Sequence, residues 1–355
     1  MNNNITLTQL CAALDACGEA YGVLALQNGA QAVVTRRGGR IFGPFLSADA
    51  PSLNWISAAL SSGSGLRALI ESGAWNLGGE RLWIAPEFAY NIGDRFAFDA
   101  SYNLPAAIDP ASYALEAAGD GWALVADMTL PAQGLSGGGE KRITAARTVR
   151  PAADPLRALS RYDELTAGVA FAGYEHTVTL TERDDSPLPA ETWVLIQLNP
   201  GGQLVIPVTP AVEVLDYFGG LPDSARVVHG DHIRVDITGA QRFKAGYKAA
   251  GVHGRLAYFA PAGPQPYLLV RAFFVNPSAP YVEEPPQQPG SAGQAVHVYN
   301  DDGGLGGFGE MECSGQAVGG GTGRSASADT FTLWAYAGPA DKLRAIARAL
   351  LGVAV

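Results

Sequence analysis

The chain has 355 residues, of which 47% are hydrophobic and only 16% are charged, so we expect a globular protein rather than a disordered one. Its formal net charge of −10 argues against nucleic acid or an anionic membrane as a partner, because binding to either depends on Lys and Arg. The sequence has no apolar run of about 18 residues or more, so no bilayer-spanning segment is expected.

The cysteine content favours a reducing compartment. The three cysteines form an odd number without the spacing of a metal site, as expected for free thiols. The chain also begins without a basic segment ahead of an apolar core, which a secretory signal would need. We therefore predict a cytoplasmic protein.

A helix is expected at each end of the chain. Thr6 and Gln9 have the spacing of a capping box, and Gly18 provides a stop. Between them one face of a helix would carry Leu7, Leu10, Cys11, Leu14 and Cys17. The corresponding apolar stripe near the C-terminus consists of Leu343, Ile346, Ala347 and Leu350. The predicted helices span about residues 6–17 and 339–351.

Most of the remaining chain is predicted to form strands. Short runs rich in β-branched and aromatic residues alternate with turns that contain glycine. In chain order the expected strands are 21–27, 31–35, 40–45, 122–130, 141–149, 192–198, 203–208, 255–260, 267–276, 294–300, 308–313 and 330–336. Helices of 10–15 residues do not alternate with these strands, which argues against a parallel α/β sheet. Segment 277–293 is expected to be a surface loop, so residues 1–355 are predicted to form a single domain.

One segment combines a double glycine with an apolar strand that carries Trp, Arg and Glu. Residues 75–87 read WNLGGERLWIAPE, and they resemble the signature of the galactose mutarotase-like superfamily, which includes the aldose 1-epimerases. Further segments resemble landmarks of that family, in the family's order: 38–41, 192–202, 243–246, 308–313 and 329–336. Taken alone, segment 75–87 fits a buried tryptophan strand closed by Pro86 better than a sugar site. The resemblance implies a mainly β fold, an antiparallel β supersandwich with short terminal helices.

The resemblance also implies proton transfer at the anomeric centre of a sugar, which needs no cofactor. The family's base lies on a late strand, which matches Glu310 and Glu312 here. Residues two apart on a strand share a face, so both carboxylates would point the same way, opposite Met311 and Cys313. Glu312 is the predicted catalytic base. The alternative is an acidic strand that merely faces solvent.

The family's acid is usually a histidine, or in one branch an arginine, that precedes the double glycine. Leu77 occupies that place here. The predicted acid is therefore His297, which alternates with Val296 and Val298 just before the strand of Glu310. The alternative is a structural histidine within a strand.

The substrate-binding side chains are expected to come from distant parts of the chain and to converge with Glu312 on one concave surface. Strand alternation places Arg81 and Trp83 on one face, with Leu82 and Ile84 toward the core. The predicted substrate-binding residues are Arg81, Trp83, Glu87, Lys244 and Glu310. A flat Trp face suits a sugar ring, and Arg and Glu can hydrogen-bond its hydroxyl groups. The predicted partner is a small-molecule carbohydrate.

Two other motifs do not indicate a cofactor or a metal. Residues 304–309 fit GxGxxG, but they precede a strand instead of opening a helix after one. Residues 229–232 read HGDH and lack the further ligands of a zinc site. Three functions remain open at this stage: an aldose 1-epimerase, a non-catalytic sugar-binding protein, and a structural or assembly protein built on the same sheets.

Overall fold

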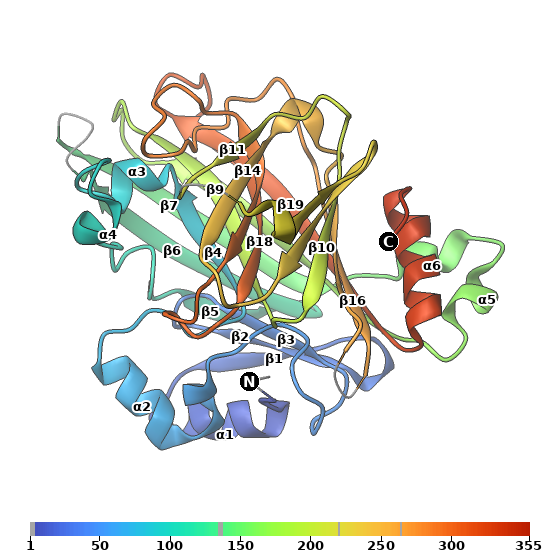
Figure 1. The fold of residues 1–355 in the computed structure, drawn as a ribbon. Helices are drawn as coiled ribbons and strands as arrows, with labels where there is room; N and C mark the ends of the chain where they lie inside the picture. The colour runs from blue at the N-terminus through green and yellow to red at the C-terminus, as the bar shows by residue number, and fades with distance from the viewer. Residues whose placement is uncertain (1–3, 134–137, 219–220, 263–264) are drawn as a thin grey trace.

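Two large antiparallel sheets make up the computed structural model, which describes residues 4–133, 138–218, 221–262 and 265–355 (Figure 1). Across the nine-stranded sheet the order is β1 (Tyr21–Ala25), β2 (Gln31–Thr35), β3 (Ile41–Phe45), β4 (Glu80–Ala85), β9 (Pro189–Leu198), β18 (Gly309–Gly319), β17 (Gln294–Asn300), β14 (Phe243–Lys248) and β11 (Val214–Asp216). Across the ten-stranded sheet it is β12 (Arg226–Val228), β13 (His232–Ile237), β10 (Gly202–Pro207), β15 (Arg255–Ala260), β16 (Tyr267–Phe273), β19 (Ala326–Ala337), β8 (Ala170–Glu182), β7 (Glu140–Pro151), β6 (Gly121–Pro131) and β5 (Ala114–Ala118). The predicted mainly β, antiparallel class is confirmed.

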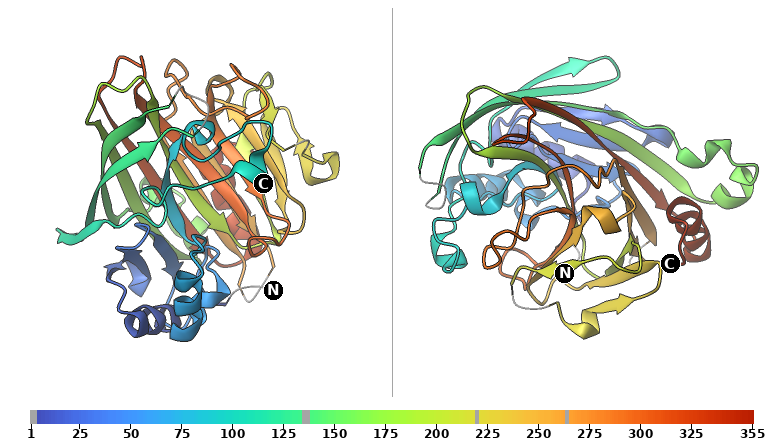
Figure 2. Two further views of the ribbon diagram at one scale, coloured as in Figure 1. Left: turned by 90° about the vertical axis from the view of Figure 1, so that its left-hand side faces the viewer. Right: turned by 90° about the horizontal axis from the view of Figure 1, so that it is seen from above.

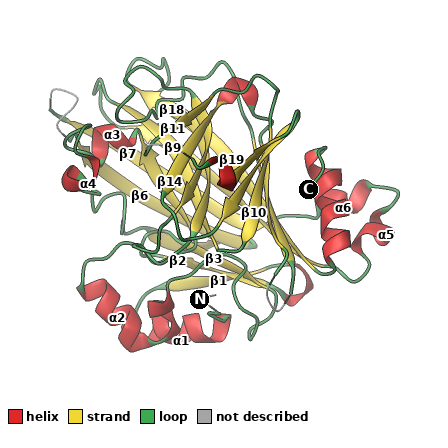
Figure 3. Cartoon of the chain, viewed as in Figure 1, coloured by secondary structure: helices red, strands yellow, loops and turns green. Residues whose placement is uncertain are grey.

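The α-helices of the described residues lie around the sheets rather than between them (Figure 3). They are α1 (Leu7–Cys17), α2 (Gly63–Glu71), α3 (Glu87–Tyr90), α4 (Phe98–Ser101), α5 (Tyr162–Thr166) and α6 (Ala340–Leu351). Figure 2 shows α1 and α2 together at one end of the molecule and α5 and α6 together on another side. None of the helices within the described ranges combines the length and apolar character that crossing a membrane requires.

Local sequence explains where the first helix begins and ends. The Thr6 hydroxyl accepts a hydrogen bond from the Gln9 amide at 3.2 Å, and the Thr6 amide donates to Gln9 Oε1 at 3.0 Å. This reciprocal capping box satisfies two amides that the first turn would otherwise leave unpaired. Gly18 ends the helix in a left-handed conformation, with φ of 67°, which a residue with a Cβ rarely adopts.

The main core lies between the two sheets, where inward-facing side chains of both sheets meet. The nine-stranded sheet contributes Leu82, Ile84, Ile196, Val298, Met311 and Cys313. The ten-stranded sheet contributes Leu124, Ile143, Val178, Leu180, Leu269 and Leu333. Burial of these side chains supplies the main driving force for folding.

Charged groups are enclosed in this apolar core. Glu80 on β4 accepts hydrogen bonds from the Tyr174 hydroxyl at 2.6 Å and from His176 Nδ1 at 2.7 Å, and it pairs with Arg271. Arg147 Nε donates to His176 Nε2 at 2.9 Å, which assigns the neutral tautomer with its proton on Nδ1. Burial alone would raise the pKa of Glu80, but Arg271 and His176 outweigh it and lower that pKa to about 2. Glu80 is therefore ionised and joins the two sheets.

The segment between β16 and β17 differs from the predicted surface loop. Residues 277–293 do not form a surface loop throughout, because Tyr281 and residues 283–286 are buried. The Glu283 carboxylate accepts a hydrogen bond from the Glu87 amide at 2.6 Å, and Glu284 Oε1 pairs with Arg95 at 2.5 Å. These carboxylates hold the middle of the segment against α3 and against Arg95, which follows α3 in the chain. The Pro-rich composition does not indicate these long-range interactions.

Replacement of Arg271 with Met should destabilise the protein by about 3–5 kcal/mol, because Glu80 would keep a buried charge without its cationic partner. Urea denaturation followed by circular dichroism measures this change in the free energy of unfolding.

Arg150→Met is the matched control, since Arg150 also pairs with a glutamate across two strands but is 62% exposed. Its loss should cost less than about 1 kcal/mol. Equal losses for the two variants would contradict a structural role for the buried pair.

Candidate functional site

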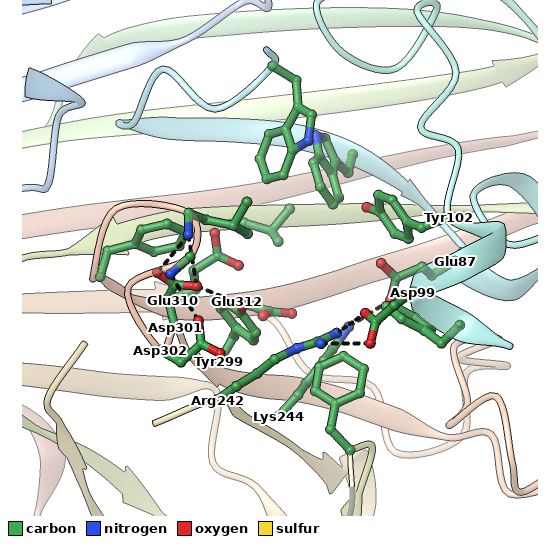
Figure 4. Close-up of a pocket in the computed structure, with 18 of the residues that line it drawn as sticks. Glu87, Asp99, Tyr102, Arg242, Lys244, Tyr299, Asp301, Asp302, Glu310 and Glu312 are labelled. Carbon is green, nitrogen blue, oxygen red and sulfur yellow. Dashed lines mark hydrogen bonds and ion pairs between the residues drawn. The ribbon is translucent and has the colours of Figure 1, made fainter. Parts of the chain in front are cut away.

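A cavity of about 460 Å³ lies on one face of the nine-stranded sheet (Figure 4). The side chain of Glu80 on β4 points toward the ten-stranded sheet. Because side chains alternate along a strand, Arg81 and Trp83 both point to the opposite side, into the cavity. The cavity is lined by six acidic residues (Glu87, Asp99, Asp301, Asp302, Glu310 and Glu312), three basic residues (Arg81, Arg242 and Lys244), and an aromatic group consisting of Trp75, Trp83, Phe98, Tyr102, Trp193, Phe218, Tyr299 and Phe308.

Strand register brings the residues of this face into rows. Arg81 pairs with Leu195, Leu195 with Glu312, Glu312 with His297, and His297 with Gly246. The neighbouring row consists of Gln197, Glu310, Tyr299 and Lys244. Five adjacent strands thus place side chains that are far apart in the sequence within one site.

The double glycine before β4 is required by backbone conformation and space. Gly78 and Gly79 have φ of 96° and 76°, in the left-handed region that favours glycine. A Cβ on Gly78 would come within 2.6 Å of the backbone of Trp55 and Ile56, and one on Gly79 within 2.8 Å of the Ile41 carbonyl. The glycines let β4 enter the sheet at the position that directs Arg81 into the cavity.

Arg81 is held by a carboxylate and two aromatic rings. Its Nη2 donates to Glu310 Oε1 at 2.8 Å, and the same oxygen accepts from Gln197 Nε2 at 2.8 Å. The guanidinium lies 4.3 Å from the ring centre of Trp83 and 5.2 Å from that of Trp75, as in cation–π pairs. Glu310 Oε1 therefore accepts hydrogen bonds from both Arg81 and Gln197.

Lys244 occupies the opposite part of the site. Its Nζ pairs with Glu87 Oε2 at 3.1 Å and lies 4.3 Å from the ring centre of Trp193 and 4.8 Å from that of Tyr217. Burial alone would lower the pKa of Lys244, but Glu87 and other nearby carboxyl groups outweigh it and raise that pKa. Lys244 therefore remains a cation at neutral pH.

Glu312 has a different environment from Glu310. Its side chain is buried, and the one hydrogen bond found for it within the described residues comes from Trp193 Nε1 to Oε2 at 3.0 Å. Burial raises the pKa of Glu312 to about 8, with Lys244 opposing the shift and Glu310 adding to it. The pKa of Glu312 thus lies close to neutral pH, in the range that suits a general acid or base.

Six of the seven residues named from the sequence line the cavity: Arg81, Trp83, Glu87, Lys244, Glu310 and Glu312. His297 does not line it. Its Nε2 hydrogen-bonds the Tyr217 hydroxyl at 3.0 Å, and its ring lies edge-on to Trp193 with 6.2 Å between ring centres. Burial and the charge of Lys244 lower the pKa of His297 well below its usual value, so the imidazole is neutral.

Sequence reasoning missed the rim of the cavity. Arg242 forms two hydrogen bonds with the Asp99 carboxylate at 2.8 and 3.0 Å, and its guanidinium lies 4.4 Å from the ring centre of Phe218 (Figure 4). Phe98 packs edge-on against Phe218. No local pattern predicts this pair, because its partners are 143 positions apart.

A glycine loop forms another wall. The Asp301 carboxylate accepts hydrogen bonds from the amides of Gly303, Leu305 and Gly307, which folds residues 301–308 back toward Trp55. The Asp-Asp-Gly-Gly run at 301–304 is a turn signal that could have marked this wall in the sequence.

Glu283 is a further residue that sequence reasoning missed. It contacts the Glu87 amide but does not line the cavity, and its Oε1 has no hydrogen-bond partner among the described residues. Burial raises the pKa of Glu283 to about 8, Lys244 opposes the shift and Glu87 adds to it. In the described ranges no group of three or more His, Cys, Asp or Glu is arranged to hold a metal ion.

The two antiparallel sheets define a galactose mutarotase-like fold. The structure aligns with that of a candidate aldose 1-epimerase from Escherichia coli K12 at a TM-score of 0.50 and 12% identity, over 89% of this chain and 99% of that one. It also aligns with a galactose mutarotase-like protein from Lactobacillus casei at a TM-score of 0.45 and 13% identity, over 90% and 100% of the two chains.

Residues 19–355 match the model of a family of unknown function, DUF6786, and the chain belongs to that family. No curated protein matches the sequence. The predicted resemblance to galactose mutarotase-like proteins is thus confirmed at the level of the fold.

Glu310→Gln should lower the pKa of Glu312 from about 8, because it removes a like charge two residues away on the same face and frees Arg81 from its carboxylate. A ¹³C NMR titration of the Glu312 carboxyl carbon measures this change.

Glu116→Gln on the exposed strand β5 is the control and should leave the titration of Glu312 unchanged. A wild-type Glu312 that titrates near the ordinary glutamate value of about 4.3 would contradict the assigned environment.

Proposed function

We propose that the cavity binds a sugar and that the protein interconverts the anomers of that sugar, as an aldose 1-epimerase does. The observation that carries the proposal is the position of Glu312, a buried carboxyl group that titrates near neutral pH, within a cavity lined by aromatic faces and hydrogen-bonding groups. Glu312 would exchange a proton with the anomeric hydroxyl group. The galactose mutarotase-like fold supports this proposal by analogy.

The polar residues of the cavity would hold the sugar hydroxyls. Arg81 Nε and Nη1 have no hydrogen-bond partner within the described residues, so they could donate to ligand oxygens. Glu87, Glu310 and Lys244 would accept from or donate to further hydroxyls while remaining in their ion pairs. Trp83 would offer a flat apolar surface to the ring. His297 would act as a positioning residue, because it contacts Tyr217, which packs on Lys244.

We also propose that the protein is a single domain and that it is cytoplasmic. Residues 1–355 would fold as one domain, which the core shared by both sheets supports. The free thiols of Cys11, Cys17 and Cys313 suit the cytoplasm.

A sugar-binding protein without catalysis is the second candidate. None of the described residues that line the cavity is a histidine, the usual acid of the resembling family. Leu77, in the place of that acid, is buried in a separate apolar cluster with residues of α1 and α2. With Leu77 there, the chain would lack one catalytic group but would still be able to bind a sugar.

Comparison of wild type with Glu312→Gln tests the proposal. Exchange between the α and β anomers of a panel of aldoses is measured by NMR exchange spectroscopy, and binding by calorimetry. The wild type should accelerate exchange for at least one aldose, and the variant should lose at least about 100-fold of that acceleration, because an amide does not exchange the proton. Binding should change by less than about tenfold, since the amide still hydrogen-bonds hydroxyls.

Glu116→Gln again serves as the control and should behave as the wild type. Binding without exchange in the wild type would favour the non-catalytic candidate. Exchange that survives Glu312→Gln undiminished would remove Glu312 from the mechanism.

A further inference from the structure

The cavity contains few groups that could act as the acid. Arg81, Arg242 and Lys244 are cations that each pair with a carboxylate. Burial raises the pKa of both Tyr102 and Tyr299. All of these are weak acids at neutral pH, and general acid catalysis is most effective when the pKa lies near the working pH.

The charged groups around Glu312 are already paired, so the carboxyl group of Glu312 itself is the candidate proton donor. Its strand contributes the Glu310 carboxylate, α3 contributes Glu87, β4 contributes Arg81, and β14 contributes Lys244. Both cations are already bound to other carboxylates, and His297, which is opposite Glu312 on β17, is neutral. The described residues include no cation bound directly to Glu312, and burial outweighs the charges of Lys244 and Arg81, so the pKa of this carboxyl stays raised.

We propose that Glu312 acts alone as both acid and base, with one carboxyl oxygen delivering a proton to the sugar's ring oxygen while the other takes the proton of the anomeric hydroxyl. This inference rests on the proposed function and identifies the acid that the family resemblance leaves open. It explains how anomer exchange can proceed in a cavity whose described lining residues include no histidine.

The geometry of the Glu312 carboxyl group matches that of the sugar's anomeric centre. The ring oxygen and the anomeric oxygen are both bonded to C1, and the two oxygens of a carboxyl group are likewise bonded to one carbon, so the two pairs have similar spacing. The Trp193 indole donates to Glu312 Oε2, which assigns the proton to Oε1. Oε2 retains a second lone pair for the anomeric hydroxyl.

The step balances without another reactant. The bond between C1 and the ring oxygen breaks, and its electron pair stays on the ring oxygen, which takes the proton from Oε1. The electrons of the anomeric O–H bond form the carbonyl at C1, and that proton passes to Oε2. Rotation about the bond from C1 to C2 exposes the other face, and the reverse transfers close the ring. Glu312 is neutral before and after.

The pH dependence of the exchange tests this assignment. Because the neutral carboxyl is the active form, kcat should be constant below the pKa of Glu312, about 8, and should fall about tenfold per pH unit above it. NMR exchange spectroscopy over about pH 6–10, with the buffer-catalysed rate subtracted, measures the profile. Glu310→Gln should shift the descending limb to lower pH, since it lowers the pKa of Glu312.

A rate that instead rises as pH increases through about 8 would overturn the inference, because it would show an ionised Glu312 acting as a base beside a separate acid, and the proposed epimerase function would stand. Absence of exchange at every pH would overturn the proposed function as well. A second measurement does not depend on any variant. The wild-type rate in mixtures of H2O and D2O should curve with deuterium content, as expected for two protons in motion, and a straight line would contradict the concerted step.

Discussion

The register of β18 between β9 and β17 is the constraint on which the rest of the site depends. Because side chains alternate along a strand, this register sends Met311 and Cys313 into the core between the sheets and Glu310 and Glu312 onto the opposite face. A slip of one residue would bury both carboxylates among apolar side chains and expose the sulfur-containing ones. The apolar core between the sheets therefore fixes which face of β18 carries the carboxylates that line the cavity.

Charge balance on that face explains why its two strand carboxyls differ. Buried cations need partners, and Arg81 and Lys244 find theirs in Glu310 and Glu87. Glu312 is left with one indole donor. Glu310 and Glu312, 5% and 1% exposed on the same strand, thus have different partners, and burial raises the pKa of Glu312. The same logic applies inside the sandwich, where Arg271 keeps Glu80 ionised at comparable burial.

Much of the fold and part of the site follow from local rules in the sequence. Strand alternation correctly placed Arg81 opposite Leu82 and placed Glu310 beside Glu312, because period-two patterning depends only on neighbouring residues. The pair of Arg242 with Asp99 depends on how distant segments meet, and no local pattern encodes that. Burial of Glu283 within a Pro-rich segment has the same cause, since its partner is the amide of Glu87.

For His297, strand alternation predicted the face of the sheet but not whether the side chain reaches the cavity. It shares a row with Glu312, as its alternation with valines indicates, but Tyr217 covers it. That cover requires Gly246, because a Cβ there would lie 3.0 Å from both the His297 ring and the Tyr217 ring. A glycine on one strand thus lets a tyrosine reach the histidine of the next, and the imidazole becomes a buried hydrogen-bond partner. Since the buried imidazole is neutral and outside the cavity, the proposed proton transfer on this face falls to the carboxyl group beside it.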